Sequence, residues 1–336
     1  MSGAVEIYLH GFPIPGRTVE LAMQAEQWGF DGLLLADSEN LVGDPYVELT
    51  LASRATERLR LGPAVTNPLT RHPAVTAAAL ATLQVESGGR AVAVFGRGDS
   101  AVLQLGLRPA TTAQLEQGLT QLQGFLSGEE VELGEGRPAR MAWVAALHPT
   151  KVPIDVAATG PQTIALGAGH AERVTFTVGA DPRRVSWAVG EARRAAGGRG
   201  GVSLGAFVNF AVNSDMDVAR GLVRGSVAIF AHFVSEGPLG VLPEEDRLVV
   251  QRLGAAYEER SHGLSTAAHA TLLPDGFVDR FAVVGSAEQC IERLRGLLEL
   301  GLERLIMVPG SRDADPALVA ESNARFASEV LPALRS

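Results

Sequence analysis

The sequence is poor in the residues that build covalent or metal-based frameworks. Cys290 is the only cysteine among 336 residues, which excludes an internal disulfide and a metal site built from cysteines. Lys151 is the only lysine and the formal net charge is -9, so no basic stripe serves general nucleic-acid binding. No apolar run reaches the ~18 residues of a membrane span, and no signal-peptide pattern opens the chain. We expect a cytoplasmic protein that binds neither membranes nor nucleic acid.

Several catalytic signatures are also absent. The chain has no H-E-x-x-H, no C-x-x-C and no G-x-S-x-G, so we expect no metal and no evident nucleophile. His10 ends a predicted strand and is a candidate catalytic residue or ligand contact. The remaining histidines are scattered, and we expect them in surface or loop positions: His72, His148, His170, His232, His262 and His269.

What the sequence does contain is an alternation of short apolar runs with amphipathic stretches. With 46% hydrophobic and 20% charged residues it can fill a core easily. Strands are predicted at Val5–His10, Gly32–Ala36, a run ending near Val65, and residues 90–96, 153–160, 172–179, 202–212 and 302–310. Helices are predicted at Arg17–Trp28, Pro45–Ala52, Pro73–Gln84, Thr112–Leu126, Gln162–Gly169, Pro182–Ala196, Asp217–Phe233 and Pro316–Leu334.

Eight such units predict one α/β domain over residues 1–336, a (β/α)8 TIM barrel. Strands that are apolar throughout are typical of a parallel sheet buried on both faces. Two insertions interrupt the repeat, residues 127–150 after strand four and residues 236–283 after strand seven. Because long loops in compact domains are often lids or binding loops, we expect both to shape a pocket and the second to cover a barrel mouth.

The loops after strands five and six are suited to an anionic ligand. The sequence "ATGPQT" places Thr159 and Gly160 before Pro161, which suits the first turn of a helix, where free N–H groups attract anions. Thr177, Val178 and Gly179 follow the next strand and let backbone approach a phosphate closely. A plain capped turn remains the alternative. A mouth with a phosphate site but no nucleophile suits a bound cofactor that supplies the chemistry.

The stretch "VFGRGDS", residues 94–100, permits three interpretations. Its Arg-Gly-Asp could bind a cell-surface receptor, but nothing indicates secretion. It also fits G-x-G-x-x-A, yet a dinucleotide fingerprint belongs to the first βαβ unit with an acid at a strand end about 20 residues on. Here it follows the fourth strand, and Glu116 falls in a helical segment. We therefore predict the loop after barrel strand four, with Gly96 and Gly98 giving a ligand close access.

The chain resembles the bacterial luciferase-like superfamily of flavin- and deazaflavin-dependent oxidoreductases, and is most similar to its coenzyme F420 branch, which includes methylenetetrahydromethanopterin reductases. The blocks that carry the resemblance include "AEQWGFDGLLLADSENLVGD", "VFGRGDSAVLQLGLRPAT", "KVPIDVAATGPQTIALGAGHAERVTFTVGADP" and "FAVVGSAEQCIERLRGLLELGLERLIMV". They run in family order over most of the chain.

The resemblance implies a ring system held over the carboxyl-terminal mouth of the barrel. A non-prolyl cis peptide supports the ring in the family, and the matching bond here is Ala64–Val65. Asp99 matches an acid close to hydride transfer, which makes it the first catalytic candidate beside His10. Ser38 stands where the family often has histidine. The implied cofactor-binding residues are Asp37, Ser38, Ala64, Val65, Thr66, Asn67, Gly96, Gly98, Thr159, Gly160, Pro161, Thr177, Val178 and Gly179.

The resemblance further implies an oxidoreductase that transfers a hydride between coenzyme F420 and a small organic substrate, as a homodimer. A monooxygenase that uses reduced FMN and O2 is the alternative. A non-catalytic barrel that has lost its cofactor is a third hypothesis. The sequence identifies no particular substrate.

Overall fold

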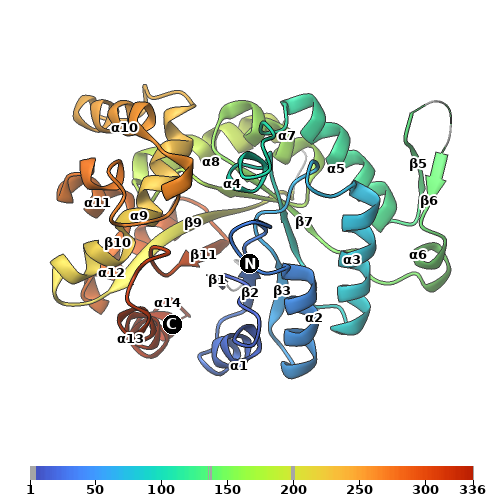
Figure 1. The fold of residues 1–336 in the computed structure, drawn as a ribbon, viewed down its shortest axis with the longest axis horizontal. Helices are drawn as coiled ribbons and strands as arrows, with labels where there is room; N and C mark the ends of the chain where they lie inside the picture. Colours follow the sequence, from blue (N-terminus) through green and yellow to red (C-terminus); the bar gives the residue numbers. More distant parts are fainter. Residues whose placement is uncertain (1–4, 135, 137, 198–200, 336) are drawn as a thin grey trace.

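The computed structural model describes residues 5–134, 136, 138–197 and 201–335, and it confirms the predicted barrel. Figure 1 shows the strands near the centre of the molecule with helices around them. All residues of the second and last barrel strands are buried, which explains why their sequences, apart from Arg304, are apolar without alternation. The barrel strands are β1 (Glu6–Gly11), β2 (Gly32–Leu35), β3 (Arg60–Pro63), β4 (Ala93–Phe95), β7 (Ile154–Ala158), β8 (Arg173–Phe176), β9 (Ser203–Val212) and β11 (Arg304–Val308).

The eight strands are parallel and nearly close on themselves. They follow the order β3-β2-β1-β11-β9-β8-β7-β4, so β3 and β4 stand at the two ends. Single bridges join these ends, Leu61 to Ala91 and Thr66 to Phe95. A Cβ on Gly62 would lie 1.9 Å from the Val92 carbonyl oxygen. The two strands therefore approach at this seam because residue 62 has no side chain.

The outer helices begin where the sequence provides helix-start signals. Proline stands in the first turn of α2, α3, α7, α8 and α13, and Asp44, Asp181 and Asp315 cap three of them. The helices of the outer layer are α1 (Thr18–Gln27), α2 (Pro45–Ala55), α3 (Pro73–Glu86), α5 (Thr112–Leu126), α7 (Pro161–His170), α8 (Pro182–Ala196), α12 (Ala287–Glu299), α13 (Pro316–Arg325) and α14 (Leu331–Arg335). None of the helices in the described ranges is long and apolar enough to cross a bilayer.

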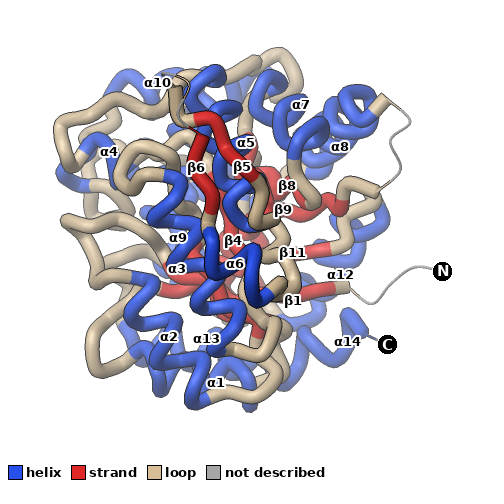
Figure 2. Tube along the Cα trace, turned by 90° about the vertical axis from the view of Figure 1, so that its right-hand side faces the viewer, coloured by secondary structure: helices blue, strands red, loops and turns tan. Residues whose placement is uncertain are grey.

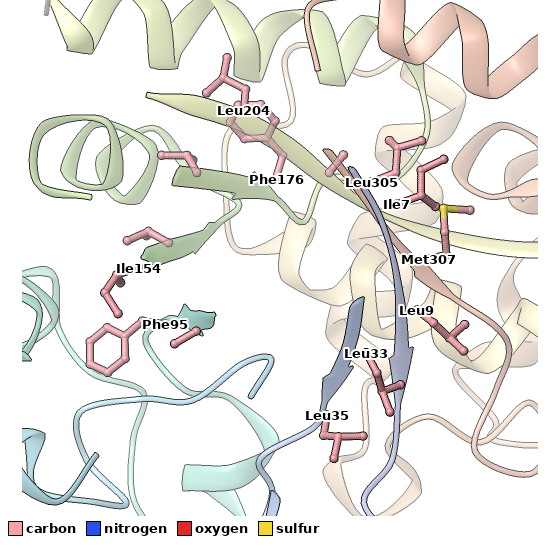
Figure 3. Packing of buried hydrophobic residues seen from close by; sticks show 14 of the residues in the cluster. Ile7, Leu9, Leu33, Leu35, Phe95, Ile154, Phe176, Leu204, Leu305 and Met307 are labelled. Carbon is pink, nitrogen blue, oxygen red and sulfur yellow. The ribbon is translucent and has the colours of Figure 1, made fainter. Parts of the chain in front are cut away.

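Two hydrophobic layers stabilise the barrel. The outer layer lies between strands and helices, and Figure 3 shows part of it, including Ile7, Leu33 and Leu305. The inner layer fills the barrel with residues that alternate with the outer ones along the strands, such as Tyr8 and Leu34. Each strand is packed on both faces, because its residues contribute to both layers. This packing fixes the backbone at the carboxyl end of the strand, and with it the side chains at the mouth.

The first insertion does not shape the mouth, contrary to the sequence prediction. It forms a hairpin of β5 (Glu130–Glu132) and β6 (Pro138–Arg140), followed by α6 (Ala142–Leu147); residues 135 and 137 lie outside the described residues. Figure 1 places the hairpin at the right-hand edge, and Figure 2 shows it along the outside of the barrel. None of its described residues lines the cavity at the mouth.

The second insertion covers the mouth as predicted, but it begins earlier than residue 236. Helix α9 (Met216–Ser235) buries its apolar face in the same cluster as the barrel interior, whereas α12 packs in the outer layer. The barrel helix of this unit is therefore α12, and α9 already belongs to the covering segment. Amphipathic spacing predicts a helix but does not say which surface covers its apolar face. The segment continues with α10 (Glu244–Ala256), short 3-10 turns at Glu259–Ser261 and Ala270–Leu272, α11 (Asp275–Phe281) and β10 (Val283–Gly285).

Candidate active site

A cavity of about 560 Å³ opens at the carboxyl-terminal ends of the barrel strands. Its size lies within the range that small-molecule and cofactor sites usually have. Loops after seven strands line it, together with α9 and the rest of the covering segment. The predicted site residues that line it are His10, Asp37, Ser38, Ala64, Val65, Gly96, Gly98, Asp99, Thr159, Gly160, Pro161 and Thr177.

Four predicted site residues lie behind the cavity wall instead. Asn67 is fully buried, and its Oδ1 accepts the backbone N–H groups of Leu69 and Thr70. Thr66 is fully buried too, Val178 belongs to the outer core, and a Cβ on Gly179 would meet the Phe281 ring at 2.6 Å. These four residues are not among those that line the cavity, and they surround it from behind.

The floor of the cavity is a flat apolar ledge. The Ala64–Val65 peptide is cis, as the family resemblance implies. Gly96 lies against it, since a Cβ on Gly96 would stand 2.8 Å from Cγ1 of Val65. Gly98 has a φ of +79°, a conformation that side chains disfavour. These glycines let the strand-four loop stay close to the ledge, which leaves a flat surface suited to a planar ring.

One end of the cavity is the N-terminus of α7. Gly160 is its N-cap residue and provides no side-chain cap, so the first N–H groups of α7 are free to bind an anion. Gly160 has no atom within 4 Å of the place a Cβ would take, among the described residues. The hydroxyl groups of Thr159 and Thr177 form a hydrogen bond of 2.5 Å beside it. Open space, free N–H groups and two hydroxyls fit a phosphate.

Asp37 lies at the carboxyl end of β2 and is almost completely buried. Burial raises the pKa of its carboxyl group to about 6, against the opposing effects of the Thr66 hydroxyl and Arg71. A carboxyl group with this pKa changes its charge near neutral pH, which is common at functional sites.

Asp99 begins the short helix α4 (Ser100–Leu103), which the sequence reading missed. Its Oδ2 is buried and has no hydrogen-bond partner among the residues described. Burial, together with the nearby carboxylates of Glu259 and Glu236, raises the pKa of Asp99 to about 7. Asp99 can therefore be protonated at neutral pH and is suited to donate or accept a proton inside the cavity.

His10 is fixed in one orientation at the end of β1. Its Nε2 lies 3.0 Å from the carbonyl oxygen of Ala64, and Phe12 and Phe207 contact its ring edge-on. Burial lowers the pKa of His10, so the ring is neutral at pH 7 with the proton on Nε2. This hydrogen bond occupies the Nε2–H of His10 and ties its ring to the ledge.

The structure adds cavity residues that the sequence analysis missed, some of them from the covering segment. Phe207 of β9 and Phe230 of α9 have ring centroids 6.1 Å apart, and Phe233 continues the row at 5.9 Å from Phe230. Arg312, after β11, lines the same end. The spacing of Phe230 and Phe233 on one helical face was visible in the sequence, but the surface they face was not.

The prediction that the other histidines are surface or loop residues is wrong for His232, which is half-buried within helix α9. His262 and His269 lie in turns, as predicted, but they are buried, at 9% and 1% exposed. Both contact Tyr257, whose hydroxyl lies 2.9 Å from Nδ1 of His262. The Tyr257 ring also stacks on His232, with centroids 3.9 Å apart. Isolated histidines carry no local sequence signal for such a cluster, because its members come together only when the segment folds over the mouth.

Comparisons with known proteins agree with this architecture. The sequence model of the family described as luciferase-like monooxygenase matches residues 6–304. A 5,10-methylenetetrahydromethanopterin reductase of Methanolobus tindarius is 29% identical over 304 residues, which covers 86% of this chain and 89% of the relative. An F420-dependent glucose-6-phosphate dehydrogenase of Microbacterium testaceum is 26% identical over 350 residues, covering 96% and 94%.

The fold also matches solved structures. The coenzyme F420-dependent tetrahydromethanopterin reductase of Methanopyrus kandleri superposes with a TM-score of 0.77 at 23% identity. The match covers 98% of this chain and 99% of that one, which shows that the two share the fold.

Proposed function

This chain belongs to the luciferase-like monooxygenase family, and we propose that it is an oxidoreductase that uses coenzyme F420 to transfer a hydride to or from a small organic substrate. Relatives named as F420-dependent support the choice of coenzyme. The observation that carries the proposal is that the α7 N-terminus, the ledge at Ala64–Val65 and the Asp99 carboxyl group all line one cavity.

The cavity fits a deazaflavin with a phosphate on its side chain. The free backbone N–H groups in the first turn of α7, at Gln162 and Thr163, would hold the phosphate, with the Thr159 and Thr177 hydroxyls beside it. The apolar ledge of Ala64, Val65 and Gly96 would support the ring.

Asp99 would donate or accept the proton that the reaction requires in addition to the hydride. When bound, coenzyme F420 supplies a donor or acceptor of a hydride, which is two electrons and one proton. Reduction of a carbon–heteroatom double bond needs one more proton, and Asp99 would give it to the heteroatom. In the reverse direction the Asp99 carboxylate would take it. His10 would keep the ledge in place through the Ala64 carbonyl.

The substrate would enter at the end formed by Phe207, Phe230 and Phe233. Three rings at this end favour an apolar part of the substrate. Glu236 also lines the cavity, and its charge disfavours a second phosphate.

The test is a fluorescence titration of the purified protein with oxidised coenzyme F420 and, separately, with FMN. We expect micromolar binding of F420, much weaker binding of FMN, and bleaching of F420 absorbance in the presence of an oxidisable substrate. Absence of F420 binding would exclude the proposal. Tight FMN binding with O2 consumption by the reduced flavin would instead support the monooxygenase alternative.

A further inference from the structure

Three titratable side chains from three separate elements meet at the cavity wall, where Asp99 lines the cavity and the other two lie behind it. They are Asp99 after β4, His232 of α9 and Glu259 of the covering segment, and one donor atom of each lies within 4.8 Å of the others. Nε2 of His232 is 3.7 Å from Oε1 of Glu259. Each side chain also has a buried atom without a hydrogen-bond partner among the described residues, namely Asp99 Oδ2, His232 Nδ1 and Glu259 Oε2. Buried polar atoms are normally paired, so this concentration calls for an explanation.

The charges around the cluster favour retention of a proton. Glu236 follows α9 and raises the pKa of both Asp99 and Glu259, in addition to the effect of burial. No arginine or lysine in the described part of the chain forms an ion pair with either Asp99 or Glu259. Arg312 lines the same cavity, but its charge acts on Tyr257 and His262. Two carboxyl groups this close, without a cation, titrate as a coupled pair.

The surroundings also hold the cluster in place. Tyr257 stacks flat on the His232 ring, and Nδ1 of His262 lies 3.8 Å from Oε2 of Glu259. Burial lowers the pKa of His232, so its ring is neutral near pH 7 and can accept one proton while it donates another. The Glu259 side chain is 32% exposed, which gives the cluster contact with solvent, whereas Asp99 Oδ2 is sealed from it.

We propose that Asp99, His232 and Glu259 form a proton-sharing cluster in which His232 and Glu259 are positioning residues that keep Asp99 protonated and return its proton from solvent. This inference rests on the proposed function. In each reductive turnover the hydride bonds to the substrate carbon and the Asp99 proton bonds to the adjacent heteroatom. The Asp99 carboxylate then regains one proton, which passes from water through Glu259 and His232. Neither positioning residue contacts the reacting atoms.

The experiment measures the proton affinity of Asp99 directly, in protein without cofactor. Carboxyl infrared difference spectra would be recorded between pH 4 and pH 9, with Asp99→Asn identifying the band. We expect wild-type Asp99 to titrate near pH 7, as its pKa of about 7 implies. Glu259→Gln should lower the midpoint by about one pH unit, a tenfold loss of proton affinity, because it removes a like charge. Glu258→Gln is the matched control, since Glu258 is exposed and lies outside the cluster, and it should leave the midpoint unchanged.

A kinetic measurement distinguishes a role of His232 and Glu259 in positioning the Asp99 proton from a purely structural role. With F420 and substrate, His232→Gln and Glu259→Gln should lower kcat about tenfold without changing KM, and Glu259→Gln should move the pH profile by the same amount as the infrared midpoint. A wild-type midpoint near pH 4, or no shift in Glu259→Gln, would overturn the inference. So would micromolar Zn²⁺ binding that Asp99→Asn abolishes, because the cluster would then be a cation site. Because the infrared titration needs no cofactor, it separates failure of the cluster from failure of F420 binding.

Discussion

Nη2 of Arg304 lies 2.8 Å from Oδ2 of Asp155 inside the barrel, where both side chains are almost completely buried. The Thr175 hydroxyl joins them, because it donates to Asp155 and accepts from Arg304. The pair links β7 to β11 across the barrel interior, through β8, below the ledge of the active site.

Breaking this pair should destabilise the whole barrel. Asp155→Asn leaves the Arg304 charge buried without its partner, so we expect the free energy of unfolding to fall by about 3–5 kcal/mol. Urea denaturation followed by circular dichroism measures the loss. Glu191→Gln is the control, because its ion pair with Arg194 is on the surface, and it should cost less than about 1 kcal/mol. Equal effects of the two variants would contradict a special role for the buried pair.

The seam between β3 and β4 should tolerate no side chain at residue 62. In Gly62→Ala the new Cβ would collide with the Val92 carbonyl oxygen, which belongs to rigid backbone. We expect soluble expression to fall sharply, or thermal unfolding to begin at least about 10 °C lower. Gly221→Ala provides the contrast, because that position is exposed in α9 with open space around it, and alanine should stabilise the helix by about 0.5–1 kcal/mol.

The α7 N-terminus should determine coenzyme affinity. Gly160→Asp introduces a carboxylate that caps the free N–H groups and repels a phosphate, so F420 binding should weaken by at least about tenfold. The helix itself should not suffer, since aspartate is a better N-cap residue than glycine. Gly221→Asp adds the same charge on the exposed surface and should leave the titration curve unchanged. Unchanged affinity in Gly160→Asp would place the phosphate elsewhere.

Asp99 should control the pH dependence of turnover. Its pKa is about 7, so the protonated donor is present below that value and disappears as the pH rises. Substrate reduction should therefore slow above pH 7, and substrate oxidation should slow below it. Asp99→Asn should lower kcat by about 10²–10⁴-fold and remove this pH dependence while F420 still binds. Stopped-flow absorbance of F420 across pH 5–9 measures both, and a persisting acid–base step in the variant would assign it to another group.

Ionisation of buried Asp37 should reduce the free energy of unfolding as the pH rises through about 6. Its folded-state pKa of about 6 is above the ordinary value of 3.8, so the folded protein binds this proton more tightly than the unfolded chain. The stability it contributes is complete below about pH 4 and is lost as the pH rises through 6. In cofactor-free protein, Asp37→Asn should therefore be more stable than the wild type by about 1–3 kcal/mol at pH 8, with no difference near pH 4. Guanidinium denaturation at the two pH values tests this, and an equal difference at both would contradict it.

Much of the barrel was predictable because its strands and helices are determined by residues that are close together in the sequence. Strands buried on both faces have continuous apolar sequences. Where an aspartate cap is followed by a proline, the first residue of the helix can be predicted from the sequence. The strand ends then indicated which loops meet at the mouth, which is why Asp37, Asp99 and Gly160 all line the cavity. The cis bond at Ala64–Val65 came only from the family resemblance.

The unpredicted parts depend on contacts between distant segments. Helix α4 has four residues, too few to produce a periodic pattern beside Asp99. Helix α9 has a clear amphipathic pattern, but nothing in that pattern separates a barrel helix from a covering helix. His232 and Glu259 are 27 positions apart and meet Asp99 only after the segment folds, so no sequence window contains the cluster.

The covering segment leaves and re-enters the barrel at neighbouring points. It departs after Val212 of β9, and β10 returns beside the same strand, with Val283 paired to Phe210. The loops that fit the coenzyme come from earlier strands, while the phenylalanine row of α9 and the charge of Glu259 come from this one continuous stretch. Under the proposed function, substrate choice would thus be encoded separately from coenzyme choice. Because residues 213–282 form one continuous segment, recombination between family members could exchange this segment and change substrate specificity, while the loops that fit the coenzyme stay the same.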